Sequence, residues 1–232
     1  MQADKLAATE IQATIDRLYK RINDRFPDAG LGKVCQRLHE VSLEVHRTVR
    51  WIDRPNYWIR AVAAGLLALV TGLLAASLCQ IKLETESIGL PDFVQMTEAA
   101  VSEVVLIGAG IVTLVTYENR RKRQRVVEAV NGLRSIAHVV DAHQLTKDPD
   151  RLNKIHCLTP HSPSHSLDAY GLGRYLDYCT EMLALTSKLG FLFVQDFHDP
   201  VATAAVNDLE SLTTGLSRKI WQKIVILRNQ RV

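Results

Sequence analysis

Four side chains of the types that bind zinc stand close together in the second half of the chain: His156, Cys157, His161 and His165. Imidazole nitrogens and thiolates are ligands that tetrahedral zinc prefers. Pro160 and Pro163 stand among them, and proline disfavours the helix that would present His161 and His165 on one face. A His-rich loop explains the same residues, so a metal site and a plain loop both stay open.

A second candidate for chemistry is the pair Arg134 and His138, which is similar to the Arg–His motif of HEPN ribonucleases. In that family the two residues stand farther apart than the three intervening residues found here. A solvated helix face accounts for the pair equally simply. GxSxG, HExxH, Walker and dinucleotide motifs do not occur in the sequence. We therefore expect neither an enzyme nor a cofactor.

Two apolar segments must position everything else. Residues 61–79 form a run of 19 without a charged side chain. At about 1.5 Å per residue this run matches the roughly 30 Å core of a bilayer. The second segment covers about residues 99–117 and contains one charge, Glu103. A buried core helix would explain one such segment, but two together predict two membrane spans.

The polar residues of the second span predict a pore lining. Glu103, Gly110, Thr113 and Tyr117 lie near one helix face. An ionisable residue inside a span should face water or a partner rather than lipid. In an oligomer this face would line a central path through the membrane. The alternative is that the Glu103 side chain extends to water at the outer surface of the bilayer.

A row of small residues follows the first span: Gly65, Ala68, Gly72 and Ala75. Small residues let helix backbones approach closely in lipid, so this small-residue seam predicts helix packing and a homo-oligomer.

Basic residues set the expected orientation. Arg47, Arg50, Arg54 and Arg60 precede the first span, whereas the connecting loop holds Lys82 among four acidic residues. A basic cluster follows the second span directly: Arg120, Arg121, Lys122, Arg123 and Arg125. Positive charge stays on the cytoplasmic side, so both termini are expected inside. The cluster is expected to face anionic lipid, with a ligand site as the alternative. The net charge is only +3, so no direct nucleic-acid binding is expected.

The remaining sequence predicts helices, so the expected fold is all-α: a two-span transmembrane helical hairpin with a cytoplasmic helical bundle built from N- and C-terminal helices. Apolar residues at helical spacing mark each of these helices. Pro27, Gly30 and Gly32 are expected to interrupt the N-terminal helices, and Pro91 is expected in the turn before the second span. Asp199 followed by Pro200 predicts the start of the last one. The four cysteines have no CxxC spacing and are expected to be reduced thiols. The predicted regions are N-terminal helices 1–57; a hairpin 58–119 with spans at about 60–80 and 99–118 and a periplasmic loop 81–98; a basic juxtamembrane helix 120–145; a loop 146–166; and C-terminal helices 167–232.

This order of elements, with its basic stop after the second span, resembles the SLATT group of two-transmembrane effectors of bacterial conflict systems. The resemblance covers roughly residues 31–145 and lies in architecture. It implies an oligomeric inner-membrane effector that disrupts the membrane in antiphage defence, triggered by an upstream sensor protein or nucleotide signal. A non-channel scaffold or signalling protein is the alternative, and a membrane-tethered HEPN-like nuclease is the third reading.

Overall fold

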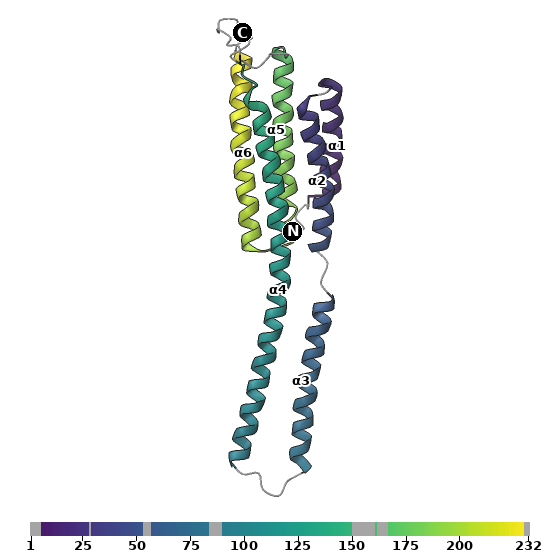
Figure 1. The fold of residues 1–232 in the computed structure, drawn as a ribbon, viewed down its shortest axis with the longest axis vertical. Coiled ribbons are helices and arrows are strands. Elements are labelled where there is room, and N and C mark those ends of the chain that lie inside the picture. Colours follow the sequence, from purple (N-terminus) through teal and green to yellow (C-terminus); the bar gives the residue numbers. More distant parts are fainter. Residues whose placement is uncertain are drawn as a thin grey trace, which may run out of the picture. The chain divides into compact units, whose positions relative to one another are not determined.

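The computed structural model describes residues 6–27, 29–52, 57–83, 90–149, 161 and 167–229. Within α3 and α4 it leaves out the side chains of 59–60, 73–74, 77–83, 90–93, 95–96, 99–100 and 103. The protein is all-α, and the described residues contain no strand. The described residues form six helices: α1 (Ala8–Arg25), α2 (Gly30–Ile52), α3 (Tyr57–Leu83), α4 (Leu90–Leu145), α5 (Ala169–Phe191) and α6 (Pro200–Asn229) (Figure 1).

The chain divides into two compact units. The first comprises Met1–Asp53 and Arg123–Val232, and the second comprises Arg54–Lys122. Helix α4 contributes to both, because its first part belongs to the second unit and its last 23 residues, 123–145, belong to the first. We call the first unit the bundle and the second the α3–α4 unit.

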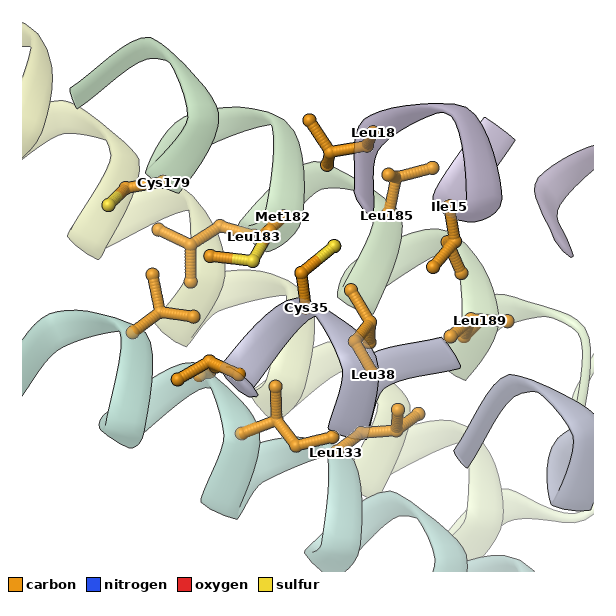
Figure 2. Close-up of a cluster of buried hydrophobic side chains, with 14 of the residues drawn as sticks. Ile15, Leu18, Cys35, Leu38, Leu133, Cys179, Met182, Leu183, Leu185 and Leu189 are labelled. Carbon is orange, nitrogen blue, oxygen red and sulfur yellow. The ribbon is translucent and has the colours of Figure 1, made fainter. Parts of the chain in front are cut away.

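The bundle is held together by the apolar stripes that the sequence predicts. On α1 the four residues at helical spacing, Ile11, Ile15, Leu18 and Ile22, are all buried. Helix α5 packs against α1, α2 and α6, which makes it the central helix of the bundle. In Figure 2, side chains from four helices converge on one core, among them Leu18 of α1, Leu38 of α2, Leu133 of α4 and Met182 of α5.

The basic juxtamembrane helix is the continuation of α4 without a break. Its predicted apolar face is confirmed, because five side chains on it are fully shielded: Val126, Val130, Leu133, Ala137 and Val140. Their spacing follows the helical repeat, so one face of α4 closes the bundle core while the opposite face stays in solvent.

The last helix begins where the sequence predicts. Helix α6 starts at Pro200, and Oδ1 of Asp199 accepts hydrogen bonds from the backbone N–H groups of Val201 and Ala202, both at 3.0 Å. Proline suits this position, since the first helical N–H has no partner within the helix. The long apolar stripe of α6 packs inside the chain, chiefly against α5.

Gly32 and Pro91, which were expected to interrupt helices, both lie within helices. Gly32 was expected to interrupt the helical pattern, yet it lies buried inside α2. A Cβ there would come within 2.6 Å of Oδ1 of Asn23, so the glycine permits close approach of α1. Pro91, expected in a turn, lies in the first turn of α4, where proline is tolerated. The helices thereby cover 81–83 and 90–98 of the predicted loop, and the residues between them lie outside the described ranges.

By length and mean hydropathy, no helix in the described part of the chain qualifies as a membrane span. The two spans stay a prediction, as does the bilayer location.

Candidate functional site

The α3–α4 unit exposes large apolar side chains around its helices. The consecutive residues Val104, Val105 and Leu106 are 54%, 63% and 73% exposed. Successive residues point about 100° apart on a helix, so these three cover more than half of the circumference of α4. Other exposed apolar side chains of the unit are Tyr57, Trp58, Leu67, Leu69, Val94, Val101, Val112 and Val115. Val70 is the one large apolar side chain described as buried there. A surface of this kind needs lipid or protein to cover it.

The residues predicted to line a pore have distinct surroundings. The hydroxyl of Thr113 donates to the carbonyl of Ala109 at 2.8 Å, so it is bonded to its own helix. Tyr117 is 55% exposed, and the guanidinium of Arg121 lies 5.8 Å from its ring centroid. A Cβ on Gly110 would meet no atom within 4 Å. The side chain of Glu103 lies outside the described residues, so the lining stays a prediction.

The small-residue seam of α3 is open. Gly65, Ala68, Gly72 and Ala75 are all exposed, and a Cβ added to either glycine would meet no atom within 4 Å. Close packing along this seam stays a prediction for an assembly of several chains.

The residues of the basic cluster make different contacts. Arg123 pairs with Asp199 across the bundle, with its Nη2 2.7 Å from Oδ2 of the carboxylate. The guanidinium of Arg125 lies 4.0 Å from the ring centroid of Trp51 and so joins α4 to the end of α2. Lys122 pairs with Glu118 within α4, and Arg120 is exposed. Two of the five cations therefore fasten α4 into the bundle, a role that neighbours in sequence could not reveal.

Asp199 is the best-defined polar centre of the bundle. Nε of Arg123 donates to Oδ1 at 3.0 Å and to Oδ2 at 2.9 Å, and the two backbone amides at the start of α6 bind Oδ1. Burial alone raises the pKa of this carboxyl, but the bonds from Arg123, Ala202 and Val201 outweigh it, so the pKa lies below the usual 3.8.

This arrangement predicts a pH-dependent contribution to stability. The native-state pKa of Asp199 is lower than its unfolded-state value, so the carboxylate stabilises the fold at pH above 3.8, and this is lost as pH falls through the native-state pKa. At neutral pH, Asp199→Ala should lower the free energy of unfolding by about 0.5–2 kcal/mol through the lost helix cap alone. The free energies of unfolding of Asp199→Asn and of the unmutated protein, both measured with urea, should converge in acid, because Asp199 is then protonated and uncharged like asparagine. The matched control is Asp208→Asn, whose pair with Arg134 is 3.6 Å long and whose carboxylate is 74% exposed. If the difference in free energy of unfolding between Asp199→Asn and the unmutated protein did not decrease in acid, the proposed role of the Asp199 carboxylate would be wrong.

A cavity with a volume of about 630 Å³ lies between α2 and α4 of the bundle. It exists because α4 places small residues, Ala129, Gly132 and Ser135, toward it, while Val41 and Val45 of α2 form an apolar wall. The charged side chains around it are Lys33, Arg37, Glu44 and Glu128, and the imidazole of His143 lines it as well. Sequence reasoning missed this α2–α4 cavity, because it depends on which two helices become neighbours.

The nuclease-like pair is not assembled into a site. Arg134 lies 3.6 Å from Asp208 of α6, and His138 is exposed on the outer face of α4. The pair with Asp208 and the exposure of His138 are those of surface side chains.

The zinc-type residues are largely beyond what the structure describes. His161 is exposed, whereas His156, Cys157 and His165 lie outside the described residues. Among the described side chains, no group of three or more His, Cys, Asp or Glu residues is arranged to hold a metal ion.

Two cysteines are confirmed as free thiols. Cys35 and Cys179 are both buried, and burial raises the pKa of each thiol to about 12. A thiol with such a pKa carries almost no thiolate at neutral pH, so these two serve packing rather than nucleophilic chemistry. Cys79 and Cys157 fall among residues whose side chains are not described.

Comparisons with protein-family models, with curated proteins and with solved structures find no match to this chain.

Proposed function

We propose that this protein is an oligomeric effector of the bacterial inner membrane, whose α3–α4 unit inserts into the bilayer and permeabilises it. The observation that carries the proposal is the exposed apolar surface that covers more than half of the circumference of α4 at Val104, Val105 and Leu106. An exposed apolar surface of this extent needs lipid or protein to cover it. The uncharged run 61–79 of α3 supplies the companion segment.

The charge distribution supports the proposed orientation. Nine Lys or Arg residues stand just before the first apolar segment or just after the second, namely Arg47, Arg50, Arg54, Arg60, Arg120, Arg121, Lys122, Arg123 and Arg125. Arg120, with its side chain exposed, is the member best suited to anionic headgroups. Both termini and the bundle then lie in the cytoplasm, and the loop near Gly89 lies outside.

Assembly of several copies is part of the proposal. The open seam at Gly65 and Gly72 suits close approach of a second helix, because no side chain would stand in the way. Copies arranged in a ring would bring the Glu103 carboxylates together at the outer mouth, and a carboxylate ring favours cations. The role in antiphage defence rests on the resemblance to SLATT effectors.

The test is depolarisation of cells that express the protein, reported by a membrane-potential dye. The unmutated protein should depolarise them when expressed at high level, and Glu103→Gln should reduce the effect severalfold at matched membrane abundance. Glu98→Gln is the matched control, since Glu98 lies about one turn farther out and is exposed. Equal depolarisation by Glu103→Gln would remove the carboxylate ring from the proposal. No depolarisation by the unmutated protein would contradict permeabilisation itself.

A non-channel scaffold is the second candidate, and the α2–α4 cavity favours it. Its apolar wall and charged rim offer a docking surface in the bundle that needs no pore. A scaffold would leave the membrane potential of expressing cells unchanged. The nuclease reading keeps no structural support beyond the two side chains, and intact RNA in depolarised cells would exclude it as the cause of toxicity.

A further inference from the structure

A second hollow of the bundle lies on the outer side of α5 and α6, with a volume of about 480 Å³. We call it the α5–α6 hollow. Its lining contains two cations, Lys188 and Arg218, and the indole of Trp221, but no carboxylate. The other lining residues are mainly hydroxyl-bearing. This composition differs from that of the α2–α4 cavity, where cations and carboxylates mix.

The two cations have no carboxylate partner within the described residues. Other arginines of the bundle do: Arg21 pairs with Glu181, and Arg174 with Asp177. Glu210 lines a neighbouring hollow that shares Thr214 and Arg218 with this one. No ion pair between Glu210 and Arg218 forms among the described side chains. Among the described residues no carboxylate forms an ion pair with Lys188 or Arg218, so both cations can bind an anion in the α5–α6 hollow.

Hydroxyl groups add neutral donors around these charges. Ser187, Thr214 and Ser217 line the hollow, and within the described part of the chain they make no hydrogen bond. In contrast, the hydroxyls of Thr180 and Thr213 donate to carbonyls of their own helices. Free hydroxyls beside two cations suit the several acceptor oxygens of a phosphate group.

The indole gives the hollow an apolar end. Trp221 is 53% exposed, and the guanidinium of Arg228 lies 5.6 Å from its ring centroid on the helix. Arg228 covers one face of the indole, so a flat ring of a ligand would stack on the other face, as bases do on aromatic side chains.

The antiparallel helices fix the order of these groups. A Cβ on Gly190 would meet Leu209 at 2.7 Å, and one on Gly173 would meet Leu227 at 3.4 Å, which sets the register of α5 against α6. In that register Trp221 lies level with Cys179, next to the lining residue Thr180, and Arg218 stands about one turn away from Trp221. Lys188 lies beyond Arg218 by roughly 9 Å along the axis, at about 1.5 Å per residue. The order is thus ring face, first cation, second cation.

We propose that the α5–α6 hollow binds a phosphorylated molecule that carries a flat ring, with the ring on Trp221 and the phosphates between Arg218 and Lys188. A nucleoside di- or triphosphate is the simplest molecule of this kind. The spacing of the two cations suits a chain of two or three phosphates better than a single one. Ligand binding would then occur on the bundle, apart from the apolar α3–α4 unit.

The experiment is isothermal titration of the full-length protein in detergent with ATP, with inorganic pyrophosphate and with inorganic phosphate. ATP should bind more tightly than pyrophosphate, and phosphate most weakly. Arg218→Glu and Lys188→Glu should each weaken ATP binding at least tenfold. Lys219→Glu is the matched control, because it adds the same charge change on an exposed residue of α6 that does not line the hollow. Unchanged circular dichroism would show that each variant is folded.

Trp221→Ala separates the parts of the proposal. It should weaken ATP binding severalfold and leave pyrophosphate binding unchanged. Nanodiscs of phosphatidylglycerol form a further arm, because a lipid headgroup offers the same phosphate chemistry. Displacement of ATP by these nanodiscs but not by lipid-free buffer, with no effect of Trp221→Ala, would contradict a ring-bearing ligand. Absence of ATP binding at millimolar concentration, or equal weakening by Lys219→Glu, would overturn the site.

Discussion

Replacing Val104 and Leu106 together with arginine should move the protein out of the membrane fraction. The two residues are 54% and 73% exposed and point about 200° apart on α4, so no single protein contact could shield both. Each arginine near the centre of a span costs about 3 kcal/mol on insertion scales. Two would cost about 6 kcal/mol, or about 10⁴-fold in the insertion equilibrium. The measurement is the share of protein that stays with membranes after an alkaline carbonate wash.

The control is the same pair of changes on the bundle. Val225 and Ile226 of α6 are 38% and 41% exposed, so Val225→Arg with Ile226→Arg adds equal charge to an apolar surface outside the α3–α4 unit. That variant should remain in the washed membranes. If the Val104 and Leu106 variant also remained there in full, α4 would not insert at these positions.

Leu133→Ala should destabilise the bundle strongly, whereas Gly132→Ala next to it should not. Leu133 is fully shielded, and it extends from α4 into the core that α2 and α5 also form (Figure 2). Truncation of such a leucine costs about 2–5 kcal/mol, from lost burial and the cavity it leaves. Gly132 faces open space in the α2–α4 cavity, so alanine there should stabilise α4 by about 0.5–1 kcal/mol. Urea unfolding followed by circular dichroism in detergent measures both.

If Leu133→Ala lowers the free energy of unfolding and Gly132→Ala raises it, one face of residues 123–145 of α4 belongs to the bundle core. Similar midpoints for Leu133→Ala and the unmutated protein would instead mean that α4 contributes little to it. A lower free energy of unfolding for Gly132→Ala would mean that the α2–α4 cavity has no room for a methyl group at this position in solution.

Local signals in the sequence predicted the helices well. Apolar residues at helical spacing located the buried faces of α1, α4 and α6, because burial on one side of a helix leaves a repeat that can be read along the chain. Asp199 and Pro200 marked the start of α6, since both act on the first turn of their own helix. The all-α class follows from these local patterns.

Contacts between distant segments were beyond the sequence. Arg123 and Asp199 are 76 positions apart, so an arginine that stabilises the bundle looks no different from its neighbours that face solvent. The α2–α4 cavity and the α5–α6 hollow likewise depend on which helices lie together. Gly32 read as a helix breaker because the need for close contact with Asn23 of α1 is visible only in three dimensions.

The most direct test of the membrane account is the topology of the full-length chain, measured by paired reporters in bacterial cells. Alkaline phosphatase, which is active only outside the cytoplasm, is inserted near Gly89, and green fluorescent protein, which fluoresces only inside, is fused after Val232. We expect an active phosphatase at Gly89 and a fluorescent C-terminus in the same membrane fraction. An inactive phosphatase at Gly89 together with protein that stays in the soluble fraction would contradict it.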